Sequence, residues 1–467
     1  MKNSTKYIWQ LLIMSSIFLF GCSKGFTDLK PYNSLPLDEA LGTEADLNYA
    51  INGLYAGMRN TNLFGRTLPF IGDIMADNAY ISTSNSGRYI QENNYTLNAQ
   101  NGDVSGLWAQ AYTVILRANN IINANVPSSP AVDQYKGEAL AIRAFVYWKL
   151  ANLFGKPYLA DQNALAVPLV LSYDITLRPA RNTVAEVYTQ VIADLSQAIP
   201  LLTQVKNSSF VSKAFAQGIL AKVYLYQGDY SNALSWAQAV VNEGGYSLIP
   251  AENLNAYWAN PVPRSDKVET IFEVAADGVN NMGFDALANM YNQSGYGDGL
   301  ASSELYALYS ATDARKGLIL EGTRGGADAL IVNKFQNTQN TTDKDDVKVL
   351  RYAEVLLIAA EASARLQLES QALSYVNELM QQRDPAFGGY RVSGTALLAA
   401  IIEERRKELA FEGDRFDDLN RLQEDIRRSR EYPPQALNIP AGDDRRVWPI
   451  PQVELDANPN MVQNTSY

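Results

Sequence analysis

A helical hairpin constrains the fold of this chain more than any other feature of its sequence. Residues 211–244 read VSKAFAQGILAKVYLYQGDYSNALSWAQAVVNEG, in which two helical patterns meet at a turn formed by Gly228 and Asp229. Ala233 and Ala237 place small side chains on one stripe of the second helix, which permits close helix packing. The length of about 34 residues and this pattern are typical of a tetratricopeptide repeat.

More helices are expected on both sides of this hairpin. Residues 350–383 form a second hairpin pattern of the same size, and long amphipathic segments lie at 108–125, 133–155 and 184–202. The units do not recur at a fixed period, so insertions must interrupt the repeats, and insertions in repeat proteins often form the binding face. We therefore predict an all-α fold, a tetratricopeptide-like helical-repeat scaffold with irregular binding loops.

The expected insertions differ in composition from the helices. The segments at about 80–103, 245–300 and 321–346 are rich in Asn, Ser, Gly, Thr and Tyr. Such segments bury little apolar surface by themselves, and they are too long to be simple connectors. We expect one folded unit over residues 41–467, with these loops inserted into it.

The N-terminus has the layout of a lipoprotein export signal. Residues 1–21 carry two lysines and then an apolar stretch too short to span a bilayer comfortably, and Cys22 follows directly after Leu-Phe-Gly. We predict cleavage before Cys22 and lipidation of its thiol, with residues 22–40 as an extended tether. Acyl chains on one residue can hold a protein at a membrane surface without a spanning helix.

Composition excludes several classes of function. The 467 residues include no His and one Cys, so the chain alone cannot form a His-dependent catalytic triad, a His-ligated metal site or an internal disulfide. Its 39 basic and 50 acidic residues give a net charge of −11, which argues against a nucleic acid partner.

Two charged segments could have a catalytic or a metal-binding role. The run IIEERRKELAFEGDRFDDLNR at 401–421 contains many carboxylates, and a glycosidase needs two of them, but nearly every acid has a base nearby, which lowers carboxyl pKa values. We interpret this run as scaffold. Asp343, Asp345 and Asp346 loosely resemble a calcium loop but lack the spacing, the central Gly and the terminal Glu, so we expect a solvated turn, no metal and no cofactor.

The aromatic residues of the polar loops give the better signal for binding. Sugar rings stack on flat aromatic side chains while their hydroxyls bond to Asn, Asp and Arg. Each loop ring could equally anchor its own loop to the scaffold, but at least two of them are expected to contact ligand. The predicted ligand-binding residues are Asp77, Asn78, Tyr80, Arg88, Tyr89, Tyr95, Trp258, Tyr291 and Tyr296.

Several segments together resemble the SusD/RagB family of outer-membrane lipoproteins. They are the signal ending at Cys22, EALAIRAFVYWKLANLFGKPYL, AKVYLYQGDYSNAL, LRYAEVLLIAAEA, the 401–421 run, and PIPQVELDANPNMVQN near the C-terminus, in the expected order along almost the whole chain. The resemblance implies a single fold with about four tetratricopeptide-like helix pairs. It also implies a surface-exposed outer-membrane lipoprotein that passes ligand to a SusC-like TonB-dependent transporter.

The resemblance leaves the ligand open, because the binding loops have no motif common to the family. It implies a glycan or, in RagB-like relatives, a peptide, and some members bind calcium. Our principal hypothesis is a non-catalytic oligosaccharide-binding protein. The alternatives are a peptide-binding member, a surface glycoside hydrolase with paired carboxylates, and a helical-repeat adaptor without a ligand.

Overall fold

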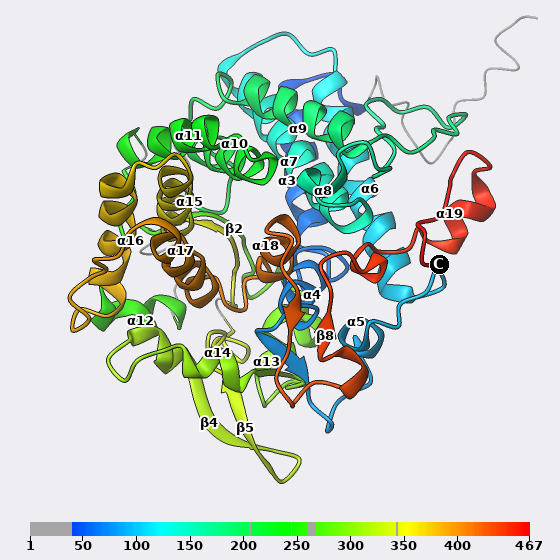
Figure 1. The fold of residues 1–467 in the computed structure, drawn as a ribbon. Coiled ribbons are helices and arrows are strands. Elements are labelled where there is room, and N and C mark those ends of the chain that lie inside the picture. The colour runs from blue at the N-terminus through cyan, green and yellow to red at the C-terminus, as the bar shows by residue number, and fades with distance from the viewer. Residues whose placement is uncertain (1–39, 205–206, 244, 260–267, 342–343) are drawn as a thin grey trace, which may run out of the picture.

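The computed structural model describes residues 40–204, 207–243, 245–259, 268–341 and 344–467 (Figure 1). The predicted signal, Cys22 and all but the last residue of the predicted tether lie outside these ranges. Within the described part of the chain, no helix is both long enough and apolar enough to cross a membrane.

Long helices packed side by side make up the largest part of the fold. They are α3 (Glu44–Met58), α6 (Gly102–Asn123), α7 (Pro130–Phe154), α9 (Val184–Ala198), α10 (Lys213–Gln227), α11 (Tyr230–Glu243), α15 (Tyr352–Arg365), α16 (Glu369–Arg383) and α17 (Gly394–Glu408). Each helix from α3 to α15 packs on the next helix in this list, and α15 contacts α17 as well as α16. This succession gives the pairs α3/α6, α7/α9, α10/α11 and α15/α16, which confirms the predicted tetratricopeptide-like scaffold.

Local sequence explains where these helices begin and end. Thr43 and Thr183 each form a capping box with the residue three positions on, and Ser129 caps α7 directly before a proline at its first position. The predicted turn at Gly228 follows α10 in the left-handed conformation, with φ of +77°, which glycine adopts without a steric penalty.

The insertions are more regular than the sequence predicted. In the four-stranded antiparallel sheet the strand order is β1 (Ala79–Ile81), β3 (Gly299–Ala301), β5 (Ala327–Val332), β4 (Ile319–Arg324). β2 (Thr270–Val274) pairs with β6 (Val347–Arg351), and β7 (Ile426–Arg427) pairs with β8 (Asn438–Ile439). These short strands within the insertions were not predicted, because pairings such as β1 with β3 join segments far apart in the sequence and leave no local signal.

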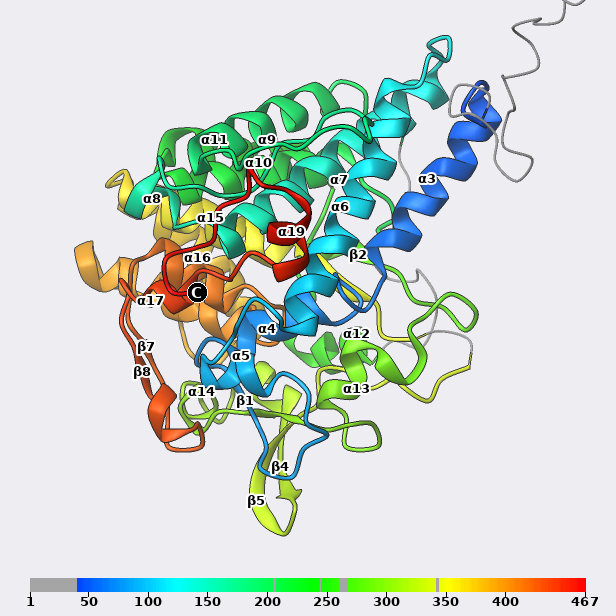
Figure 2. The same cartoon turned by 90° about the vertical axis from the view of Figure 1, so that its right-hand side faces the viewer.

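Short helices complete the insertions and the C-terminal part. They are α4 (Thr67–Ile74), α5 (Ile90–Asn94), α8 (Tyr158–Asp161), α12 (Leu254–Trp258), α13 (Leu287–Tyr291), α14 (Ser303–Ala307), α18 (Arg415–Arg421) and α19 (Gln452–Ala457). Figures 1 and 2 show that the β4–β5 hairpin projects at the end of the molecule opposite α9, α10 and α11. One large apolar core, with members from Leu47 to Met461, links the helical array to these insertions.

Candidate functional site

The carboxylates of the 401–421 run are buried in ion pairs. Glu408 accepts hydrogen bonds from Arg351 at 2.8 Å, from Arg383 at 3.0 Å and from Arg315 at 3.3 Å. Burial alone raises the pKa of Glu408, but the charges of the three guanidinium groups outweigh it and hold that pKa well below its usual range. A carboxyl in this state is a poor general acid.

The neighbouring acids of this run are similarly engaged. Glu412 accepts from Lys334 at 2.7 Å and from Arg351 at 2.6 Å, and these two cations lower its pKa despite burial. The Asp418 carboxylate accepts from Arg405 and Arg421 at 2.8 Å. The bonds of Glu412 tie the turn between α17 and α18 to distant residues, and the Asp418 bond to Arg405 joins the two helices, so the scaffold interpretation of the run agrees with its contacts.

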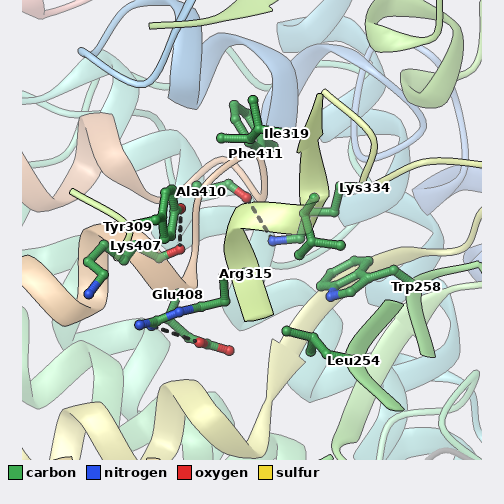
Figure 3. Close-up of a pocket in the computed structure, with 11 residues that line it drawn as sticks. Leu254, Trp258, Tyr309, Arg315, Ile319, Lys334, Lys407, Glu408, Ala410 and Phe411 are labelled. Carbon is green, nitrogen blue, oxygen red and sulfur yellow. Dashed lines mark hydrogen bonds and ion pairs between the residues drawn. The ribbon is translucent and has the colours of Figure 1, made fainter. Parts of the chain in front are cut away.

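A small cavity beside this network is a poor candidate for a ligand site (Figure 3). Its volume is about 10 Å³, which is room for roughly one water molecule. Figure 3 shows Arg315 paired with Glu408 at one side and Lys334 bonded to the Ala410 carbonyl at the other. The polar groups at this cavity already have partners within the protein.

Four of the predicted ligand-binding aromatics are buried. The Tyr95 ring has the Arg428 guanidinium over its face at 4.8 Å, and Tyr291 stacks on Phe335 with ring centres 5.5 Å apart. The other two are Tyr89 and Trp258, and all four side chains are at most 4% exposed. Their rings anchor the insertions to the core, so a ligand cannot reach these four residues in this structure.

Tyr89 and Tyr95 also fix the backbone on either side of α5. Both have positive φ, +55° and +56°, which is uncommon for a bulky residue and carries a cost of about 1 kcal/mol or more each. The Tyr89 hydroxyl meets Arg66 and Thr67 at 2.8 Å, and the Tyr95 hydroxyl donates to the Met75 carbonyl. These contacts hold a strained segment in place.

The side chains of Asp77 and Asn78 likewise bond to other residues of the protein and stabilise the fold. Asp77 forms a two-bond ion pair with Arg415 at 2.8 and 2.9 Å, and Asn78 donates to Asp73 at 3.0 Å and accepts from Arg406 at 3.0 Å. Because both side chains are buried and occupied, we also remove them from the set within reach of a ligand.

Tyr80, Arg88 and Tyr296 remain partly exposed. Tyr80 lies in β1 against Tyr432, with ring centres 5.7 Å apart. The Arg88 guanidinium lies over the face of the Tyr296 ring, 3.9 Å from its centre. It also donates a 2.8 Å hydrogen bond to the Tyr296 hydroxyl. The structure therefore brings together two predicted residues, Arg88 and Tyr296, from loops more than 200 positions apart.

Four further residues surround this pair, and the sequence interpretation missed them. The Phe284 ring meets Tyr296 edge to face with centres 4.6 Å apart, and it is 53% exposed. Asp285 accepts from Arg66 at 2.8 Å and from the Tyr296 hydroxyl at 3.0 Å. Arg324, in β4, donates to the backbone carbonyl of Tyr296 at 2.6 Å. We call Arg66, Arg88, Phe284, Asp285, Tyr296 and Arg324 the Arg88–Tyr296 cluster.

A signal for Phe284 was present in the sequence. It lies in the polar segment DGVNNMGFDALANMYNQSGYGDG, in which only Tyr was considered as a stacking residue. Arg66 and Arg324 could not have been found in this way, because nothing local connects them to that segment. Chemically, the cluster offers an exposed aromatic surface beside guanidinium and carboxylate groups, which suits a sugar ring and its hydroxyls.

Two carboxylates of the acidic loop at 343–346 accept hydrogen bonds from backbone N–H groups of the protein. Asp345 accepts the N–H groups of Gln336 and Asn337 at 3.2 and 2.8 Å, and Asp346 accepts that of Ala276 at 2.7 Å. Asp343 lies outside the described residues. No cluster of three or more potential metal ligands occurs among the residues that the structure describes.

A second hollow is lined by residues that do not belong to the Arg88–Tyr296 cluster. Its volume is about 400 Å³, and α6, α19 and the segment near residues 168–179 enclose it. Trp108 and Tyr112 form part of its wall, while most of the remaining lining is aliphatic. In this groove Trp108 is buried and Tyr112 is only partly exposed, whereas the Arg88–Tyr296 cluster has Phe284 at 53% exposure.

Comparison with known proteins gives a consistent result. A family model described as "Starch-binding associating with outer membrane" matches residues 25–225, and one described as "SusD family" matches residues 322–467. SusD-like protein P2 of Formosa agariphila is 31% identical in an alignment that covers 97% of this chain and 98% of that protein. SusD-like protein P38 of the same organism is 23% identical over the full length of both chains.

Solved structures agree in fold. A crystal structure described as a putative sugar binding protein from Bacteroides vulgatus has a TM-score of 0.82 and 29% identity, covering 91% of this chain and 98% of that one. A SusD superfamily protein from the same organism has a TM-score of 0.84 and 29% identity, covering 91% and 99%. The likeness therefore extends over nearly the whole of both chains.

Proposed function

Since the chain belongs to the SusD/RagB family, we propose that it is a carbohydrate-binding protein that captures an oligosaccharide at the Arg88–Tyr296 cluster. The observation that carries this proposal is the exposed ring of Phe284, held edge to face against Tyr296 and bordered by Arg88 and Asp285. An aromatic ring that is half exposed amid polar groups is the arrangement on which a sugar can stack.

Each component has a distinct role in the proposed binding. The Phe284 ring supplies an apolar surface for the C–H face of a sugar. Arg88 and Asp285 supply a donor and an acceptor for hydroxyl groups near it. Tyr296 positions all three side chains, because it contacts the ring of Phe284, the guanidinium of Arg88 and the carboxylate of Asp285. Binding in this form uses only the protein's own side chains and needs no cofactor or metal.

The proposal also gives the protein a place and a partner. We propose that lipid on Cys22 holds the chain at the outer-membrane surface, and that the bound oligosaccharide passes uncleaved to a SusC-like TonB-dependent transporter. Support comes from the family membership and from the signal that precedes Cys22. A Cys22→Ala variant of the full chain is expected to lose radiolabelled palmitate and to leave the membrane fraction. Retention of both would contradict the anchoring.

Affinity electrophoresis in gels that contain a panel of polysaccharides tests the binding proposal. The wild-type chain is expected to be retarded by at least one polysaccharide, and Phe284→Ala is expected to lose most of that retardation. Val279→Ala is a matched control, because Val279 is 90% exposed in the same polar segment and lies outside the cluster. Equal retardation of the wild type and Phe284→Ala would contradict the site, and new reducing ends after incubation would contradict the non-catalytic role.

A further inference from the structure

The environment of Arg88 points to the class of sugar that the cluster binds. Several arginines in the protein interior meet carboxylates directly: Arg383 bonds to Glu269 at 2.8 Å, and Arg421 bonds to Glu361 at 2.7 Å. The guanidinium of Arg88, in contrast, donates hydrogen bonds to two neutral hydroxyls, those of Ser86 at 3.1 Å and Tyr296 at 2.8 Å.

The nearest carboxylate already serves other groups. Asp285 Oδ1 is 3.8 Å from Arg88, beyond hydrogen-bond distance. The same oxygen accepts from Arg66 at 2.8 Å and from the Tyr296 hydroxyl at 3.0 Å. Among the residues that the structure describes, no other carboxylate lies within 4.0 Å of the Arg88 guanidinium. The positive charge of Arg88 therefore has no close counterion of its own.

Arg88 is nevertheless held in a defined position. The contact with the Tyr296 ring at 3.9 Å and the two hydroxyl bonds hold its guanidinium, which has five N–H groups, more than these contacts use. A guanidinium held in place is suited to a planar or tetrahedral anion, because two parallel N–H groups can meet two oxygens of a carboxylate or a sulfate. The side chain is 36% exposed, so such a group can approach from solvent.

Two further carboxyl groups, those of Glu92 and Asp298, are buried, so they are not exposed to a ligand at the surface. Burial raises the pKa of Glu92 to about 7, and the charge of Asp103 adds to this rise. Burial also raises the pKa of Asp103, although Arg66 and Arg88 lower it in part. Asp298 is fully buried and accepts from the Ser86 N–H at 3.0 Å. Of the three arginines in the cluster, Arg88 is the most exposed, with 36% of its side chain exposed against 21% for Arg324 and 11% for Arg66.

We infer that the oligosaccharide bound at the cluster is acidic, and that Arg88 binds a carboxylate or sulfate group on a sugar ring stacked against Phe284. This inference rests on the proposed function and specifies its ligand class. One short oligosaccharide can reach both side chains, because each lies within 5 Å of the centre of the same Tyr296 ring. The net charge of −11 disfavours non-specific adsorption of a polyanion, so an acidic sugar would need a defined cation such as this one.

A matched pair of ligands tests the inference. A glycan array of uronate-containing, sulfated and neutral oligosaccharides first identifies the glycans that bind the protein. The tightest acidic glycan is then compared by calorimetry with its carboxyl-reduced or desulfated form, which keeps the linkage and loses the charge. We expect the acidic form to bind roughly tenfold or more tightly, since hydrogen bonds to charged groups are the stronger ones. The modification that removes the preference distinguishes a carboxylate from a sulfate.

Variants separate this inference from the function on which it rests. Arg88→Met keeps the apolar stem and is expected to abolish the preference for the acidic form, because the charge of the sugar then meets no cation, whatever the loss of affinity that both forms share. Arg88→Lys should retain part of the preference. Arg427→Met removes the same charge from an 82% exposed side chain in β7 and should change neither affinity.

Each outcome bears on one of the two claims. Equal affinity of the wild type for both forms, preferential binding of neutral glycans on the array, or an unchanged preference in Arg88→Met would overturn the inference and leave the proposed function standing. Binding of no glycan at all would overturn the proposed function and the inference together.

Discussion

Asp73 accepts a hydrogen bond from the Gly413 N–H at 2.8 Å and so ties α4 to the turn between α17 and α18. The same carboxylate accepts from the Phe411 N–H at 3.0 Å. These bonds hold the charged 401–421 run against α4, at the base of the insertion that carries Arg88. Gly413 has a φ of +88°, and a Cβ at this position would overlap the backbone of Pro69.

We therefore predict that Gly413→Ala lowers the free energy of unfolding by about 2–4 kcal/mol, because the added Cβ would meet backbone atoms in a left-handed conformation. Urea denaturation followed by circular dichroism measures the change. Gly442→Ala is the control, since no atom lies within 4 Å of its added Cβ, and its effect should stay within about 0.5 kcal/mol. Equal stability of the two variants would contradict the contact.

Replacing Glu408 should damage folding because it would leave three guanidinium groups without their shared carboxylate. We expect Glu408→Gln to cost about 3–5 kcal/mol of stability, the range for breaking a buried pair by removing one partner. Glu403→Gln makes the same chemical change at an exposed position of α17 and should be nearly neutral. If Glu408→Gln instead left the melting temperature unchanged and abolished a hydrolytic activity, the scaffold interpretation would be wrong.

Stability should depend on pH in the mildly acidic range. Burial raises the pKa values of Asp73, Glu92 and Asp345 to about 7 each, whereas carboxyls of an unfolded chain titrate near pH 4. Between about pH 4 and 7 the folded state retains protons that the unfolded state has lost, so stability falls as pH rises, by at most about 1.4 kcal/mol per pH unit for each group.

Below about pH 4 the opposite trend should hold, because ion-paired carboxyls with lowered pKa values, such as Glu412, lose their contribution as the pH falls. Denaturation midpoints measured from pH 3 to pH 8 should therefore pass through a maximum near pH 4. Glu92→Gln should flatten the decline between pH 5 and 7, and Glu403→Gln should not. A steady rise in stability from pH 5 to pH 8 would contradict these pKa shifts.

Mutations of two tyrosines in the same segment should affect different properties, stability at Tyr291 and glycan binding at Tyr296. Tyr291 is fully buried between Phe70, Phe335 and Phe411, so Tyr291→Ala should cost about 3–5 kcal/mol. Its hydroxyl meets no hydrogen-bond partner among the described residues, so Tyr291→Phe should be neutral or slightly stabilising. Tyr296→Ala should change the melting temperature little and weaken glycan binding. Melting curves and calorimetry on all three variants distinguish these roles.

The helical scaffold could be predicted from the sequence because its signals are local. The hairpin at 211–244 carries its own periodicity and its own turn at Gly228, and the structure places helices and turn as expected. The small antiparallel sheet was missed, because Tyr80 pairs with Leu300 across 220 positions of sequence.

The site was only partly predictable for the same reason. Composition identified the polar insertions, but it could not show which rings turn inward. Tyr291 is buried because Phe70 lies against it, 5.1 Å away between ring centres, and Tyr296 is partly exposed because its neighbour is Phe284 at the surface. Five positions separate the two tyrosines, and only tertiary contacts distinguish them.

A crystal structure of the protein with a bound oligosaccharide, identified by its retardation in affinity gels, tests the central claim most directly. The account predicts a sugar ring against the exposed face of Phe284, with polar groups of the sugar bonded to Arg88 or Asp285. Density for the sugar in the groove beside Trp108 and Tyr112, or at any other place without contact to Phe284, would contradict it.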